Sequence, residues 1–124
     1  MRARRLSWRD PARISWIDES SGVSVLKEYF APVKGAVLLR DGSGVAIVEP
    51  DDAGGKGDVA ILNADGAERF RIGVPVRDGL SVIGFDQLYY VGVELTAVVS
   101  FVGRDFAYVI DPETGRFTRS YETR

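Results

Sequence analysis

Carboxylates are the reactive side chains that dominate this sequence, because histidine and cysteine are both absent. Without histidine the chain lacks the commonest general acid–base catalyst, and without cysteine it has no thiol nucleophile, thiolate metal ligand or disulfide. Asp86 and Glu94 flank an apolar aromatic segment, and two carboxylates at a suitable separation can hydrolyse glycosides. No pattern in the sequence sets that separation. We therefore predict a non-enzymatic protein with no catalytic residues, cofactor or metal, and interpret both acids as surface groups.

A second acidic segment, residues 51–58, has the sequence DDAGGKGD. It departs from a phosphate-binding loop because Lys56 is followed by Gly57, which has no hydroxyl for magnesium. It also departs from the spacing of a calcium-binding loop. We predict a polar hairpin loop in which Asp51 and Asp52 offer an acidic contact to a basic partner.

Tyr89 and Tyr90 are adjacent in an apolar segment that is typical of a strand. Because successive strand residues point to opposite faces, one ring should lie in the core and the other on the surface. A surface tyrosine beside Asp86 and Glu94 suits a protein interface, where tyrosine anchors are enriched. The candidate partner-binding residues are therefore Asp51, Asp52, Asp86, Tyr89, Tyr90 and Glu94.

Charge is distributed unevenly along the 124 residues. The first thirteen hold five arginines and one acid, and the rest hold 11 basic and 17 acidic residues, a net charge of −6. An acidic body attracts basic partners and repels nucleic acid. We expect residues 1–11 to form a flexible basic arm and residues 12–124 to form one β domain.

Short apolar segments separated by turn residues predict the elements of that domain. Strands are expected at residues 14–19, 23–30, 36–40, 45–48, 59–62, 70–72 and 80–85. The last third should form a three-stranded antiparallel meander from residues 95–102, 106–110 and 116–122. In its last strand, Phe117, Arg119 and Tyr121 should share one face. The prediction is a mainly β fold with little or no helix: a single antiparallel meander, arranged as a propeller-like curled sheet or a small sandwich. No apolar run approaches the ~20 residues that span a bilayer, so we expect a cytoplasmic protein with no membrane contact.

Two segments repeat one hairpin pattern, DVAILNADGAERFRI at residues 58–72 and FAYVIDPETGRFTRSY at 106–121. In each, an Asn or Asp side chain can bond the turn backbone, and a glycine closes the turn. The string VIDPETGRF resembles the outer hairpin of a β-propeller blade. A closed propeller needs at least four blades, so this chain is too short for one unless it oligomerises.

Size, acidic body, blade-like hairpins and the segment DFAYVIDPETGRF together resemble the small acidic β-rich immunity proteins that bacteria encode beside secreted toxins. The resemblance implies a cytoplasmic protein that neutralises a basic toxin domain by covering its active surface. Two alternatives stay open. The sheet could enclose a small apolar ligand among the aromatic residues of the last third, or the chain could be a structural module that forms a homodimer through an edge strand.

Overall fold

The computed structural model describes residues 2–123 and has eleven antiparallel strands in three sheets. The N-terminal sheet contains β1 (Ala3–Ser7), β2 (Arg13–Asp18) and β3 (Val23–Glu28), in that order. The middle sheet contains β4 (Gly35–Leu38), β5 (Gly44–Val48), β6 (Val59–Asn63) and β7 (Glu68–Ile72). The C-terminal sheet contains β8 (Val82–Val91), β9 (Glu94–Phe101), β10 (Arg104–Asp111) and β11 (Arg116–Glu122). The predicted mainly β, antiparallel fold is confirmed. The described residues contain no helix, and therefore no helix that could cross a membrane.

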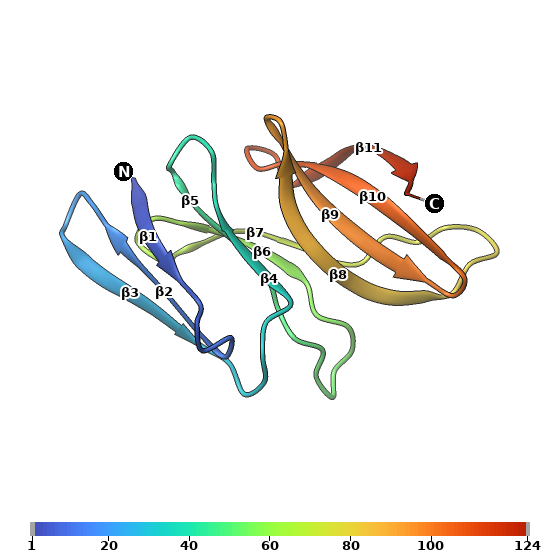
Figure 1. Cartoon of the computed structure of the whole chain (residues 1–124), viewed down its shortest axis with the longest axis horizontal. Coiled ribbons are helices and arrows are strands. Elements are labelled where there is room, and N and C mark those ends of the chain that lie inside the picture. The colour runs from blue at the N-terminus through green and yellow to red at the C-terminus, as the bar shows by residue number, and fades with distance from the viewer. Residues whose placement is uncertain (1, 124) are drawn as a thin grey trace.

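The three sheets follow one another as layers along the longest axis of the molecule (Figure 1). Each sheet is a simple meander, so every strand pairs with its neighbour in sequence. The first strands of the sheets lie beside one another, with β1 next to β4 and β4 next to β8. The close approach is clear at Gly35, where an added β-carbon would lie 3.4 Å from the β-carbon of Leu88. The sheets are therefore arranged like successive blades around a common inner edge, as in a propeller.

The middle sheet is buried on both faces, which explains the uninterrupted apolar segments of β5 and β6. Val45 and Ile47 point toward the N-terminal sheet, where they pack with Ile14 and Trp16. Ala46 and Val48 point the other way, into a second core shared with the C-terminal sheet; that core also contains Leu95, Ala97, Val99, Phe101, Phe106, Tyr108 and Ile110. Trp16 is 1% exposed, and its indole N–H donates to the carbonyl oxygen of Ala64 at 2.7 Å. This bond joins the first two sheets.

The predicted flexible arm at residues 1–11 is wrong for residues 3–7, which form β1. Ala3 pairs with Asp18, and its N–H also donates to the carbonyl oxygen of Gly42 at 2.7 Å. Ala3 and Leu6 face the core, while Arg4 and Arg5 are exposed. The strand contains a bulge, and Arg5 has a φ of 58°. A boundary between an arm and a domain therefore does not occur at residue 11.

The predicted three-stranded antiparallel meander of the last third is confirmed as β9, β10 and β11, and β8 joins the same sheet as a fourth strand. Residues 82–91 make one long strand, β8, with two irregularities in its pairing with β9. A further bulge between Val109 and Ile110 places Phe117 opposite Ile110, while Arg119 is opposite Val109. Phe117 therefore packs inward against Tyr108, with ring centroids 4.9 Å apart, and Arg119 and Tyr121 point outward. The prediction that these three residues share a face is wrong, because an extra residue reverses the alternation.

Candidate functional site: the outer face of the C-terminal sheet

The six candidate residues lie in two separate regions. Asp51 and Asp52 belong to the loop between β5 and β6, and Asp86 lies at a bulge in the first half of β8. Tyr89, Tyr90 and Glu94 lie toward the other end of β8 and at the start of β9. The structure brings only Tyr89 and Glu94 to one surface.

Asp51 is occupied by interactions within the chain. Its carboxylate accepts the N–H of Gly57 at 2.8 Å and pairs with Lys34 at 3.2 Å. The Gly57 hydrogen bond and the Lys34 ammonium lower the pKa of the Asp51 carboxyl. This residue stabilises its loop and has little unbalanced charge to offer a partner.

Asp52 and Asp86 are exposed, and neither forms an ion pair with another residue in the described range 2–123. Asp52 accepts the N–H of Gly54 at 2.7 Å in a small turn. These two carboxylates remain accessible at the end of the molecule that carries the β5–β6 loop. They lie on a loop and a strand bulge, not in a cleft.

The two adjacent tyrosines do point to opposite faces, as predicted. Tyr90 packs against the core, and its hydroxyl accepts the N–H of Arg40 at 2.8 Å. Tyr89 points away from the core, on the same face as its strand partner Thr96, and is 37% exposed. Tyr90 therefore has a structural role, whereas Tyr89 is available to a partner.

Tyr89 belongs to a surface that we call the C-terminal outer face, the side of that sheet turned away from the middle sheet. Its centre consists of four small side chains that strand alternation turns outward on β9 and β10: Thr96, Val98, Ala107 and Val109. All four are at most 6% exposed, although they belong to neither core. Larger outward side chains surround and cover them: Gln87, Tyr89, Val91, Glu94, Asp105, Arg119 and Tyr121.

An ion pair crosses this face. Glu94 on β9 accepts a hydrogen bond from the Arg119 guanidinium on β11, and the carboxylate raises the pKa of Arg119. The Arg119 guanidinium carbon also lies 5.3 Å from the ring centroid of Tyr121. Such an exposed pair contributes little to stability, because water and salt screen the two charges. The accessible part of the face is the ring of aromatic, apolar and charged side chains around a buried centre, a mixture that occurs at protein interfaces.

The sequence-based choice of site residues missed Tyr121, Arg119 and the four small central side chains. An alternation count along β9 would have found Thr96 and Val98 outside the core, since Leu95, Ala97 and Val99 fill the inward positions. Tyr121 was assigned to a face together with Phe117, and the bulge in β10–β11 pairing separated them.

No group of three or more acidic side chains that could hold a metal ion occurs within residues 2–123. Glu94 is committed to Arg119, and Asp86 lies at the irregular part of β8. Comparison of the sequence with protein-family models and with curated proteins found no match.

Proposed function

We propose that this chain is a non-enzymatic protein-binding domain that uses the C-terminal outer face. The observation that carries the proposal is the combination of a dry, small-residue centre with exposed Tyr89, Val91 and Tyr121 around it. Tyrosine rings beside a desolvated centre are the arrangement found at energetically important positions of interfaces. The acidic balance of residues 14–124 supports a partner with a basic surface and gives no support to nucleic-acid binding.

The immunity-type role is a second candidate, favoured by a different surface. Asp52 and Asp86 are exposed at the β5–β6 loop end and free of ion pairs with other residues in the described range. A basic toxin domain would contact these acids, so its binding would depend on Asp52 and Asp86 and not on Tyr89.

The apolar-ligand alternative receives less support from the packing. Aromatic residues of the last third were expected to line its cavity, and three of them, Phe101, Phe106 and Tyr108, belong to the core between the middle and C-terminal sheets. Phe101 and Phe106 contact each other edge to face, with centroids 5.6 Å apart. Side chains thus occupy the space that a ligand would need.

An affinity pull-down from the source organism, with mass spectrometry, tests these assignments. We expect a stoichiometric partner that is retained by wild type, lost by Tyr89→Arg and retained by Val76→Arg. Val76 is 89% exposed in the β7–β8 connection, so this variant adds the same charge outside the face.

Two other outcomes would redirect the assignment. Loss of the partner on charge reversal of Asp52 and Asp86, with no effect of Tyr89→Arg, would favour the immunity-type surface. Retention of the partner by all variants would contradict both surfaces.

A further inference from the structure

The stack of three sheets has two free faces, one at each end. The first is the C-terminal outer face. The second, the N-terminal outer face, is the side of β1–β3 turned away from the middle sheet, and it consists of Arg4, Ser7, Arg13, Ser15, Ile17, Ser24, Leu26 and Glu28. Because β1, β4 and β8 lie side by side at the inner edge, continuing the array from either end would follow a curve around that edge.

The C-terminal outer face repeats the composition of a face that is already packed. On the middle sheet, the side toward the C-terminal sheet has Ala46 opposite Ile61 and Val48 opposite Val59 in its two central strands. The C-terminal outer face has Thr96 opposite Val109 and Val98 opposite Ala107 in the equivalent strands, β9 and β10. The same small and β-branched side chains thus occupy corresponding positions, and only the second set lacks a sheet to cover it.

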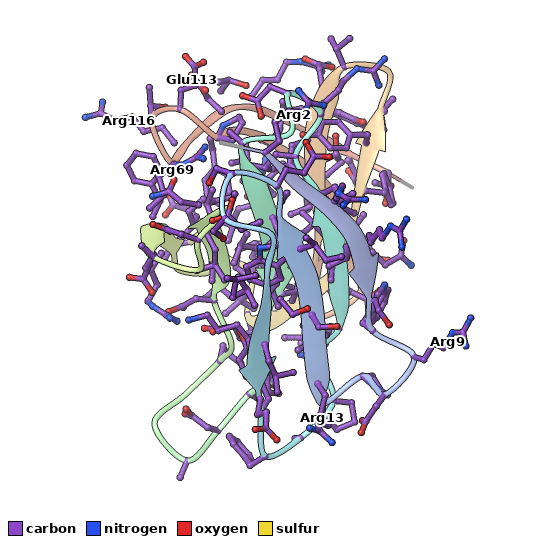
Figure 2. The ribbon with its side chains drawn as sticks, turned by 90° about the vertical axis from the view of Figure 1, so that its left-hand side faces the viewer. Arg2, Arg9, Arg13, Arg69, Glu113 and Arg116 are labelled. Carbon is purple, nitrogen blue, oxygen red and sulfur yellow. The ribbon has the colours of Figure 1, made fainter. Side chains whose placement is uncertain are left out.

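The N-terminal outer face complements it in charge. Its outward charged side chains are Arg4, Arg13 and Glu28, a net charge of +1. Those of the C-terminal outer face are Glu94, Asp105 and Arg119, a net charge of −1. Figure 2 looks onto the N-terminal end and shows Arg2, Arg9 and Arg13 at its margins.

The N-terminal outer face also offers apolar and cation–aromatic contacts. Leu26 is 46% exposed and Ile17 is half-buried at its centre. Around them, the guanidinium groups of Arg4 and Arg13 are only partly engaged, by exposed ion pairs with Glu19 and Glu28. Arginine side chains of this kind stack on tyrosine rings such as Tyr89 and Tyr121.

We propose that the partner of the C-terminal outer face is the N-terminal outer face of a second copy of this chain. Two copies would pack head to tail at two equivalent places and close a ring of six sheets. Six lies within the four to eight sheets of closed radial β arrays. This inference rests on the proposed function, since it names the partner of the same face.

The smaller N-terminal sheet sets the area of each contact. Three strands spaced about 4.8 Å apart, with six residues rising about 3.3 Å each, cover roughly 290 Å² per face. Closing the ring buries four such faces, roughly 1,100 Å² in total, just above the ~1,000 Å² that a specific interface needs. Pairing only one end of each copy would bury half of that.

The first test is the mass of the wild-type chain in solution, measured by light scattering after size exclusion. The chain has a mass of 13.6 kDa, and we expect a species of twice that mass that persists on dilution into the low micromolar range. A monomer at all concentrations up to about 100 µM would overturn the proposal.

Charge exchange distinguishes head-to-tail packing from a symmetric contact between like faces. Variant one is Arg4→Glu with Arg13→Glu, and variant two is Glu94→Lys with Asp105→Lys. Each should be monomeric alone, because its two outer faces then have charge of the same sign and repel each other. Mixed in equal amounts they should dimerise again, since both interfaces then join opposite charges. Thermal melting checks that each variant is folded.

The remaining outcomes are also decisive. Dimerisation of variant one alone would indicate contact between two C-terminal outer faces and overturn the head-to-tail arrangement. A monomeric wild type that nevertheless binds a different protein through Tyr89 would overturn this inference while leaving the proposed function intact. A wild-type monomer with no Tyr89-dependent partner would contradict both.

Discussion

Among single residues, Tyr29 joins the N-terminal and middle sheets through a polar contact at the edge of their core. Its hydroxyl donates to a carboxylate oxygen of Glu49 at 3.0 Å, and Glu49 also pairs with Arg71. Burial, together with the Glu49 charge, raises the pKa of Tyr29. The protonated phenol is thus the form that the folded protein favours.

This contact predicts a loss of stability in alkaline solution. The pKa of Tyr29 is higher in the folded chain than in the unfolded chain, where it is about 10. The stabilising contribution is therefore fully present below about pH 10 and is lost as the pH rises through the folded-state value. We expect the free energy of unfolding to fall less steeply above pH 10 in Tyr29→Phe than in wild type, as measured by urea denaturation.

Tyr121→Phe is the matched control, because it removes an exposed phenol and keeps the Tyr29–Glu49 contact. Equal alkaline slopes in all three proteins would show that Tyr29 does not couple ionisation to folding.

Among elements, the β10–β11 turn is held against the neighbouring sheet. Gly115 has a φ of 72°, and a β-carbon at this position would lie 2.5 Å from Cγ of Phe70 on β7. Arg69, also on β7, donates to the side chain of Asn63 at 2.7 Å and to Ser43 Oγ at 2.9 Å, and it reaches the carbonyl oxygen of Pro112 at 3.4 Å. Three hairpin ends therefore meet at β7, and the turn has no room for a side chain.

Gly115→Ala should consequently destabilise the fold for two reasons. The positive φ costs about 1–2 kcal/mol for an L-residue, and displacing Phe70 adds a packing cost of about 1–3 kcal/mol. Gly103→Ala is the control, since Gly103 has a φ of 82° and no atom within 4 Å of the added carbon. Chemical denaturation should show the larger loss for Gly115→Ala, and equal losses would contradict the Phe70 contact.

For the whole molecule, burial is concentrated in the middle sheet. All residues of β5 are buried, while β3 and β11 consist mostly of exposed residues at the outer edges of their sheets. Local opening is easiest where backbone hydrogen bonds are exposed and apolar contacts are few. The three sheets should therefore differ in their protection.

Amide hydrogen exchange measured by NMR checks this gradient. We expect the slowest exchange in β5 and β6 and the fastest strand amides in β3 and β11. If the chain forms the proposed ring, β9 and β10 should approach the protection of β5 and β6. Faster exchange in the middle sheet than in β3 would contradict the layered arrangement.

Local patterning by itself determined most of the strands and the class of fold. Glycine and Asp or Asn turns mark the hairpins at residues 41–44, 63–66 and 111–115, because their backbone requirements are local. The opposite orientation of Tyr89 and Tyr90 follows in the same way from strand geometry. Neither conclusion needs knowledge of distant parts of the chain.

Tertiary structure decided the rest, because it depends on residues far apart in sequence. Five arginines made the first thirteen residues resemble an arm, yet Gly42 and Asp18 pair with Ala3 and make it part of a strand. Asp51 was a binding candidate until Lys34 and Gly57 were found to satisfy it. Val98 and Val109 lie outside both cores because no further sheet packs on that side of the C-terminal sheet. The sequence could not show this, since an apolar residue in a strand has the same pattern whether or not a second sheet covers it.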